Sequence, residues 1–271
     1  MTQLDAASIR QSLTTASNLD RLEVFSRIDS TNTYLKDQPS PQPGRFRVAI
    51  AEHQTAGRGR QDRAWISSPG KSLCLSLSYR FAVAPPDLQA LTLALGVGVA
   101  ASLSDLGVAR VKVKWPNDIL IGDEKLGGML TEAQYRASDD VTVIVGLGLN
   151  IGLPEALDAD DVSDWADTAT DLKSVLEEPP SRQELSRAVI DTLFETCKSF
   201  EHDGFQAFAD QFRRFDALSS RNVVLDTPDG VVNGIAQGVD EHGALLVEVD
   251  EALRPVITGS VKHIGNRDGS T

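Results

Sequence analysis

The segment Gly57-Arg58-Gly59-Arg60 has the residue types and spacing of an anion-binding loop. Glycine lets backbone N–H groups approach a ligand closely, and arginine offers a planar fork of donors that pairs with carboxylate or phosphate. A solvated turn or a weak nucleic-acid contact would use the same residue types. The segment therefore predicts a phosphate or carboxylate site, which its neighbours must support.

A second group of polar residues surrounds an expected turn. Trp115-Pro116-Asn117-Asp118 combines an aromatic plane, a fixed turn and two side chains able to reach metal, water or amide partners. Lys125 opens a segment of small residues, 125–132, on which a ligand could lie while the ammonium meets an anion as a point charge. An ordinary Pro-Asn turn and a surface lysine are the alternatives at this point.

Other kinds of site are not supported. The sequence contains no Gly-x-Ser-x-Gly elbow, no Walker loop, and no Gly-x-Gly-x-x-Gly followed by a helix. We expect the acidic stretch of residues 158–171 to be a solvated loop rather than a cation site. The histidines lack metal-ligand spacing and are expected to be structural; they are His53, His202, His242 and His263.

The composition is that of an acidic globular protein. The 271 residues carry 39 acidic and 26 basic side chains, and this net charge of −13 repels a phosphate backbone. The longest apolar run, residues 91–103, is shorter than the roughly 20 residues of a membrane span, and the N-terminus has no signal-peptide pattern. Cys74 and Cys197 have no redox or metal spacing. We therefore expect a cytoplasmic protein without a DNA or membrane partner.

Hydrophobic periodicity predicts the elements that must position these residues. Residues 45–52 read as a strand, and leucine alternation over residues 72–79 predicts a half-buried strand, so the Gly/Arg loop joins two strands of a sheet. Residues 111–115, 119–121 and 125–132 predict further strands with a hairpin turn at Gly122-Asp123-Glu124. The glycines of the buried strand 141–150 indicate close approach by another group. The sheet is expected to be largely antiparallel.

Helices and a terminal module complete the expected organisation. The polar residues of Ser30-Thr31-Asn32 are typical of a helix N-terminus, and Ser181 with Glu184 forms a capping box. Leucines spaced by three and four after Pro85-Pro86 predict a helix with one buried face. The phenylalanines of residues 205–215 should pack as core. From Arg221 to residue 265, short strands and turns indicate a small β-barrel.

Together these motifs resemble those of biotin protein ligases in order and approximate spacing. The motifs are Ser30-Thr31-Asn32, Ala51-Glu52-x-Gln54-x-Ala56-Gly57-Arg58-Gly59-Arg60 with Trp65, Lys114-Trp115-Pro116-Asn117-Asp118, Lys125-Leu126-x-Gly128-x-Leu130-x-Glu132 and Gly146-Leu147-Gly148-Leu149-Asn150. The tail Gly234-x-x-x-Gly238-x-Asp240-x-x-Gly243-Ala244-Leu245-Leu246 is similar to the SH3-like barrel of that family. The resemblance covers about residues 4–264.

The resemblance implies a fold and a reaction. The fold would be α+β, with a mixed, largely antiparallel sheet and helices of the class II synthetase-like biotin–lipoate ligase type in residues 1–217, and a C-terminal SH3-like β-barrel in residues 218–271. Such ligases join biotin to ATP, release pyrophosphate, hold biotinyl-5′-AMP and pass biotin to one lysine of a biotin carboxyl carrier domain, with Mg²⁺. Because this step brings two anions together, it needs positive charge and oriented N–H donors.

The resemblance also assigns roles to residues of the biotin site. Residues 57–60, which are Gly57, Arg58, Gly59 and Arg60, would contact the biotin tail and the adenylate phosphate, and Lys125 would neutralise the reacting carboxylate and phosphate. Lys125 and Arg60 would be catalytic. The head group of biotin has donors and acceptors that must be satisfied when buried, and it would meet Ser30, Thr31, Asn32 and Gln54. A helix cap at Ser30 is compatible with this role.

On the nucleotide side, Trp65 would cover the adenine after the loop closes. Arg63, Asn117 and Asn150 match positions that contact ATP or the adenylate. Asp118 is assigned either to Mg²⁺, which usually binds few carboxylates together with phosphates and water, or to holding the region of Lys125.

Two departures from the family pattern matter. Gln61-Asp62 stands where many relatives have more basic residues and a glycine, so retention of the adenylate is the least supported expectation. Only 29 residues precede Ser30, so we expect no DNA-binding winged helix.

Two other functions are alternatives to a biotin protein ligase. One is a lipoate ligase, whose apolar head group would leave Ser30 and Gln54 unpaired, and the other is a biotin- or nucleotide-sensing protein without turnover. Monomer and homodimer both remain open.

Overall fold

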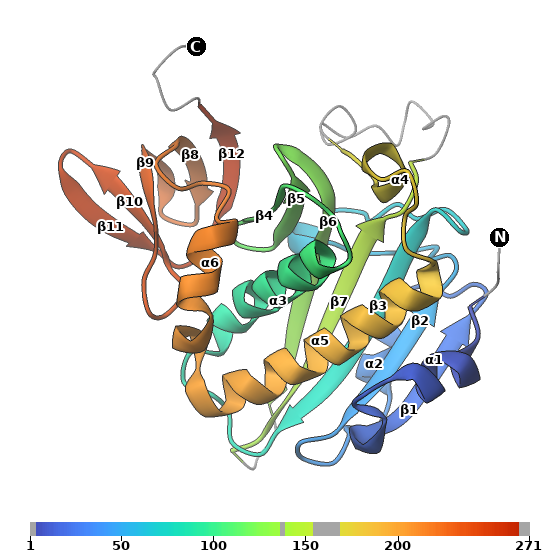
Figure 1. Cartoon of the computed structure of the whole chain (residues 1–271). Helices are drawn as coiled ribbons and strands as arrows, with labels where there is room; N and C mark the ends of the chain where they lie inside the picture. Colours follow the sequence, from blue (N-terminus) through green and yellow to red (C-terminus); the bar gives the residue numbers. More distant parts are fainter. Residues whose placement is uncertain (1–3, 136–138, 154–168, 266–271) are drawn as a thin grey trace.

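The computed structural model describes residues 4–135, 139–153 and 169–265. Within them, a seven-stranded sheet has the spatial order β1-β2-β3-β7-β6-β5-β4 (Figure 1). Its strands are β1 Leu19–Phe25, β2 Phe46–Ala51, β3 Ser72–Phe81, β4 Val111–Lys114, β5 Asp118–Ile121, β6 Glu124–Tyr135 and β7 Val141–Asn150. Strands β1 and β2 are parallel and the other neighbouring pairs are antiparallel. This confirms the expected mixed, largely antiparallel sheet.

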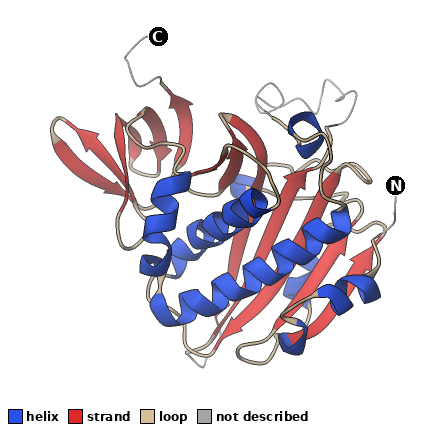
Figure 2. Cartoon of the chain, viewed as in Figure 1, coloured by secondary structure: helices blue, strands red, loops and turns tan. Residues whose placement is uncertain are grey.

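Helices cover both faces of this sheet. The long helices α3 (Leu91–Asp105) and α5 (Arg182–Asp203) cross one face, with α1 (Ala6–Ser12) beside α5, as Figures 1 and 2 show. Helix α2 (Thr31–Asp37) packs on the opposite face against β2, β3 and β7. The short helix α4 (Leu172–Val175) begins after its cap Asp171. The rest of the predicted acidic loop, residues 158–168, lies outside the described residues.

Strand β3 is buried on both faces, so the prediction of a half-buried strand is wrong. Its leucines, including Leu75, belong to the hydrophobic core under α3 and α5. Its small polar residues face α2, where the Ser76 hydroxyl contacts Thr31 and is fully buried. The alternating pattern shows which face is apolar. It does not show that another helix covers the polar face.

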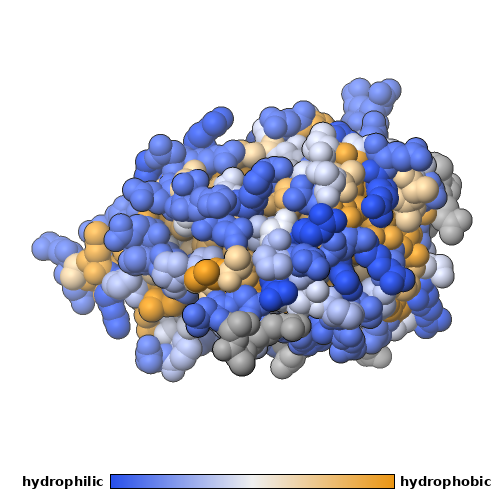
Figure 3. All heavy atoms as spheres, turned by 90° about the horizontal axis from the view of Figure 1, so that it is seen from below, coloured by the Kyte–Doolittle hydropathy of each residue, from blue (hydrophilic) through white to orange (hydrophobic). Residues whose placement is uncertain are grey.

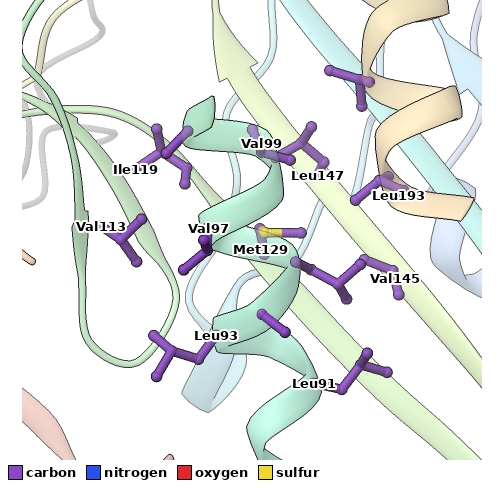
Figure 4. Close-up of a cluster of buried hydrophobic side chains, with 14 of the residues drawn as sticks. Leu91, Leu93, Val97, Val99, Val113, Ile119, Met129, Val145, Leu147 and Leu193 are labelled. Carbon is purple, nitrogen blue, oxygen red and sulfur yellow. The ribbon is translucent and has the colours of Figure 1, made fainter. Parts of the chain in front are cut away.

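Helix α3 is also more buried than the sequence predicts. It begins at Leu91 after the 3₁₀ turn Leu88–Ala90, and its side chains pack against the sheet on one side and α5 on another (Figure 4). A Cβ on Gly98 would lie 2.5 Å from Thr196 Oγ1, so glycine permits the close approach of α5. The predicted single buried face is therefore wrong, because the helix is wedged between layers.

This central position also explains the apolar composition of α3. In the described part of the chain, Leu88–Asp105 is long and apolar enough to cross a membrane by length and composition alone. However, 56% of that window is buried inside the protein, as in the core helix of a globular fold.

The other helix predictions are confirmed. The Ser181 hydroxyl and the Glu184 carboxylate form the expected capping box at the start of α5. After α5 come the 3₁₀ helix Phe205–Phe208 and α6 (Ala209–Phe215). The phenylalanines of this segment pack in the core; Phe205, Phe208 and Phe212 are buried, and Phe215 packs against them.

The C-terminal part forms a separate antiparallel sheet of the order β11-β10-β9-β8-β12. Its strands are β8 Asn222–Thr227, β9 Gly230–Val239, β10 Leu245–Val249, β11 Ala252–Val256 and β12 Ser260–Ile264, which confirms the predicted β module. Trp115 Nε1 donates to Gly243 O at 3.1 Å and so ties this sheet to the large one.

We propose residues 217/218, in the connection from α6 to β8, as the domain boundary. The face of the molecule seen in Figure 3 is mostly hydrophilic, with several separate apolar patches.

An ion pair fixes the start of α5 to the end of β2. Arg182 donates two hydrogen bonds to Glu52, one of them 2.7 Å long, and the two side chains are 10% and 14% exposed. Leu4 N donates to the same carboxylate at 3.2 Å. Burial raises the pKa of Glu52, but the hydrogen bonds from Arg182 and Leu4 outweigh burial, and the pKa is lowered. Glu52 is thus a motif residue with a structural role.

We predict that Arg182→Ala lowers the free energy of unfolding by about 3 kcal/mol at pH 7, because it leaves a buried carboxylate without its counter-charge. Since the folded-state pKa of Glu52 is depressed, the pair stabilises the fold above the unfolded pKa of about 4.3 and loses this effect as the pH falls through the folded pKa. Urea denaturation from pH 7 to pH 3 should show the difference shrinking. Arg187→Ala on the same helix removes an arginine that is 38% exposed and lies 3.9 Å from Asp191. Asp191 keeps its hydrogen bonds from Thr15, so this change should cost less than about 1 kcal/mol. Equal costs for the two variants would contradict the prediction.

Candidate functional site

The candidate site lies on the sheet face opposite α3 and α5. Helix α2 and the segment of residues 57–65, here called the 57–65 loop, lie over this face. Glycines on β7 form its floor. A Cβ on Gly146 would lie 2.4 Å from Asn32 Oδ1, and a Cβ on Gly148 would lie 2.4 Å from the Trp65 ring. The expectation that these glycines permit close approach is therefore confirmed.

The 57–65 loop is a closed hairpin between β2 and β3. Trp65 N donates to Gly57 O at 2.9 Å, and Gly59 N donates to Arg63 O at 2.7 Å. The tip is a 3₁₀ turn, Arg60–Asp62, in which Gln61 has a φ of 55°. This is the left-handed conformation that glycine adopts most easily. Gln61 Oε1 accepts a hydrogen bond of 3.1 Å from Ser260 Oγ in β12, so the tip reaches the C-terminal sheet.

The four residues predicted to meet the head group are brought together. The Ser30 side chain caps α2 by accepting from Thr33 N. Thr31 N donates to Gln54 Oε1 at 2.7 Å, which joins α2 to the segment before the 57–65 loop. Asn32 lies over Gly146. The result is a wall of polar side chains, in which Ser30, Thr31 and Asn32 are buried and Gln54 is half-buried.

Two further residues, Ser76 and Glu132, join this wall through contacts that the sequence did not reveal. Ser76 Oγ lies 2.6 Å from both Thr31 Oγ1 and Asn32 Oδ1. Glu132 accepts from Asn32 Nδ2 at 3.0 Å, Lys36 Nζ at 2.8 Å and Arg58 Nη2 at 3.5 Å. The available signal was the strand period of two, which places Ser76 on the polar face of β3. The pairing of Ser76 with Gly146 needed the strand register.

Asp118 lies between two ammonium groups at the far side of the site. Its Oδ1 is 2.7 Å from Lys125 Nζ, and its Oδ2 is 3.4 Å from Lys114 Nζ. A Cβ on Gly128 would lie 3.5 Å from Lys125 Nζ, so the Lys125 side chain extends across the glycine of β6. Lys125 is therefore held on the sheet and is not a freely extended surface lysine.

Arg60 adds a third cation to this end of the site. Its Nη1 donates to Asn117 Oδ1 at 3.3 Å, and Asn117 Nδ2 donates to Met129 O at 2.8 Å, which fixes the amide. Burial lowers the pKa of Arg60, Asp118 raises it, and Arg63 lowers it further. An arginine nevertheless stays protonated in proteins. Three cations around one carboxylate leave an excess of positive charge, which suits an anionic ligand.

The residues predicted to contact the nucleotide differ in position and burial. Trp65 lies on Gly148, and its buried Nε1 has no hydrogen-bond partner among the described residues. Asn150 is buried at the end of β7 and donates to Thr170 O at 3.1 Å. Arg63 is exposed at the rim of the 57–65 loop. A buried donor without an acceptor is costly, so this indole N–H is a candidate for a ligand contact.

A cavity of about 460 Å³ lies beside Arg60 and Asn117, and residues of both the large sheet and the C-terminal part line it. This volume falls within the range of about 300–1,000 Å³ that is usual for ligand pockets. Its wall comes from the tip of the 57–65 loop, the Trp115–Asn117 turn, the start of α3 and the turns of the C-terminal sheet, including His242 and Thr258.

The side chains near Lys125 determine which metal ion this end of the site could bind. In the described ranges, no group of three or more His, Cys, Asp or Glu side chains could hold a metal ion. The one carboxylate at the Lys125 end is Asp118, which suits Mg²⁺ held chiefly by phosphates and water. The histidines with described contacts serve the fold; His53 Nδ1 lies 3.0 Å from Ser67 O, and His242 Nδ1 lies 2.9 Å from Asp87.

Comparisons with known proteins give matches over most of the chain. The family model described as the Biotin/lipoate A/B protein ligase family matches residues 24–150, and the Biotin protein ligase C terminal domain matches residues 219–263. The chain is 32% identical over 269 residues to the biotin--[acetyl-CoA-carboxylase] ligase of Mycobacterium tuberculosis, with 96% of each chain covered. It is 33% identical to the bifunctional ligase/repressor BirA of Escherichia coli, over 88% of this chain and 72% of that protein.

A solved structure has the same fold. The biotin protein ligase from Aquifex aeolicus in complex with biotin and ATP superposes with a TM-score of 0.73 at 26% identity, over 90% of this chain and 98% of that one.

We predict that Gly148→Ala displaces Trp65 and loosens the 57–65 loop. Overpacking costs about 1–3 kcal/mol, so open forms of the loop should become about tenfold more populated. Limited digestion with trypsin and mass spectrometry should show faster cleavage after Arg58, Arg60 and Arg63. Gly146→Ala is the matched control, because its Cβ meets Asn32 and not Trp65. Loop cleavage of Gly148→Ala at the wild-type rate would show that Trp65 does not hold the loop.

Proposed function

The chain belongs to the biotin protein ligase family, and we propose that the face between α2, the 57–65 loop and β6 is its active site. The enzyme activates biotin with ATP to biotinyl-5′-AMP and transfers biotin to a lysine of a biotin carboxyl carrier domain. The observation that carries the site assignment is the group of Arg60, Lys114 and Lys125 around Asp118, next to a floor of glycines.

Biotin binds with its head group at α2. Thr31 and Asn32 are buried and Gln54 is half-buried. Their side chains form hydrogen bonds with one another and with Ser76 and Glu132. A ureido ring supplies both donors and acceptors to such a wall, whereas the dithiolane of lipoate supplies neither. Because unpaired buried polar groups are costly, this wall favours biotin over lipoate.

The biotin tail extends from the head-group wall toward Lys125. A carboxylate oxygen attacks the α-phosphorus of ATP, the bond to the bridging oxygen breaks, and pyrophosphate leaves. Lys125 and Arg60 offset the repulsion between the two anions, and Asp118 keeps Lys125 in place before the substrates arrive. Such preorganised charge lowers the barrier because no reorganisation is needed during the reaction. The neutral amine of the carrier lysine then attacks the acyl carbon, a C–N bond forms, and AMP leaves.

The nucleotide occupies the region of Trp65, Asn150 and the cavity beside Arg60. The indole covers the base, and Asn117 and Arg63 contribute contacts at the phosphates. Mg²⁺, when it accompanies ATP, supplies positive charge to the phosphate oxygens, with Asp118 as the protein carboxylate that would hold it. Gly57, Arg58 and Gly59 line the tail of biotin.

Partners and compartment follow from charge and topology. A net charge of −13 opposes binding to DNA or to an anionic membrane surface. The buried free cysteines Cys74 and Cys197 suit the reducing cytoplasm. Among the described residues, strand β1 has one neighbour in the sheet order, so its other edge could pair with a second copy of the chain or with the carrier.

The test of this function follows both half-reactions. The protein is incubated with MgATP and either biotin or lipoate while pyrophosphate is measured, and a biotin carboxyl carrier domain is then added and weighed by mass spectrometry. Biotin-dependent pyrophosphate release and the mass of one biotin on the carrier are expected. Turnover with lipoate alone would replace biotin by lipoate as the substrate, and biotin binding without pyrophosphate would indicate a sensing protein.

We predict that Lys125→Ala slows adenylate formation by about 100-fold or more, the scale observed when one preorganised electrostatic group is removed. Pyrophosphate release under saturating substrates measures this step. Lys112→Ala, which removes a lysine that donates to Arg214 O at 3.2 Å, should change the rate by no more than about twofold. Near-normal release by Lys125→Ala would remove this lysine from the mechanism.

A further inference from the structure

Ser76 occupies the centre of a line of buried polar side chains behind the head-group wall. Its hydroxyl is fully buried (0% exposed) and lies 2.6 Å from Thr31 Oγ1 on one side and 2.6 Å from Asn32 Oδ1 on the other. Ser76 lies on β3, whereas Thr31 and Asn32 lie on α2. These contacts therefore join strand β3 to the helix that carries the wall.

The direction of the hydrogen bonds in this line is fixed from its far end. Asn32 Nδ2 points at two acceptors, Glu132 Oε2 at 3.0 Å and Leu130 O at 3.4 Å. The amide oxygen of Asn32 must therefore face Ser76 and accept its hydrogen. Because a serine hydroxyl has one hydrogen, Ser76 has none left for Thr31.

Thr31 must then supply the hydrogen between the two hydroxyls. Two oxygens at 2.6 Å without a hydrogen between them would repel each other, so Thr31 Oγ1 donates to Ser76 rather than to Gln54 Oε1 at 3.0 Å. Gln54 Oε1 already accepts from Thr31 N at 2.7 Å and keeps a second lone pair. Toward the ligand, Thr31 Oγ1 therefore offers only lone pairs.

We propose that Ser76 is a positioning residue that turns the Thr31 hydroxyl into an acceptor and so selects a head group with an N–H donor. The inference rests on the proposed function, since the donor it selects is a ureido N–H of biotin. Without Ser76, the Thr31 hydrogen turns to Gln54 Oε1. This hydrogen then occupies the second lone pair of Gln54 Oε1, so the wall loses one acceptor position for the N–H of the ligand.

The test compares Ser76→Ala with wild type in calorimetric titrations with biotin and with a biotin methylated on a ureido nitrogen. Loss of one directed hydrogen bond corresponds to about a tenfold rise in the Kd of biotin. The methylated ligand lacks the N–H, so for it the same substitution should change the Kd by less than about twofold. At saturating biotin, kcat for pyrophosphate release should stay within about threefold, because the reacting carboxylate is not involved.

Matched variants separate positioning from packing. Ser78→Ala removes a hydroxyl that is also buried and lies two residues further along the same face of β3, and it should leave both Kd values unchanged. Ser76→Cys keeps most of the volume but is a weak hydrogen-bonding group, so it should reproduce the selective loss even if Ser76→Ala folds poorly. Thermal unfolding of each variant reports on folding.

The outcomes are distinguishable. Equal weakening of both ligands by Ser76→Ala and Ser76→Cys would mean that Ser76 only fills space, and unchanged biotin binding in these variants would exclude the role altogether. A wild-type protein that binds no biotin would refute the proposed function, and with it the basis for the role of Ser76.

Discussion

The site depends on a constraint in the sheet: at the points of closest approach, the strands have no side chain above the backbone. Gly148 pairs with Gly128 on one side and with Cys74 on the other, and Gly146 pairs with Ser76. A slip of one residue would place Leu147 or Leu149 on this face and fill it. Packing of those leucines under α3 and α5 therefore fixes the register that keeps the floor free of leucine side chains. The core of the protein and its binding surface are two faces of the same strands.

This open floor needs charge that is supplied from its edges. Lys125 and Lys114 come from the hairpin strands, whereas Arg60 comes from the 57–65 loop. Held close together, these cations would repel one another, and Asp118 offsets that repulsion without cancelling the excess. The whole chain carries a net charge of −13, so the positive region is local. An anion is thus attracted to one end of the floor and not to the surface in general.

The sequence predicts what local rules control. The capping box at Ser181, the cap at Ser30 and the hairpin turn at Gly122 each depend on residues close together in the chain, and all are found. Other features depend on what packs against a segment from elsewhere. The burial of both faces of β3 and the central position of α3 required the layers around them, and the contacts of Ser76 required its register with β7. The turn at Asp250 and Glu251 has positive φ at both residues without a glycine or asparagine to signal it.

At Gln61, the backbone conformation costs free energy, and contacts of the 57–65 loop must offset that cost. A residue other than glycine in the left-handed conformation costs roughly 1–2 kcal/mol. A hydrogen bond such as that from Ser260 contributes about 0.5–1.5 kcal/mol, so the contact with the C-terminal sheet offsets the strain and little more. The tip of the 57–65 loop must then be held by other contacts. Arg60 on Asn117 is one, and Trp65 on Gly148 is another. Trp65 lies on the glycine floor and Arg60 lies at the end of the site near Lys125, so closure of the loop is coupled to the surface that the ligands occupy.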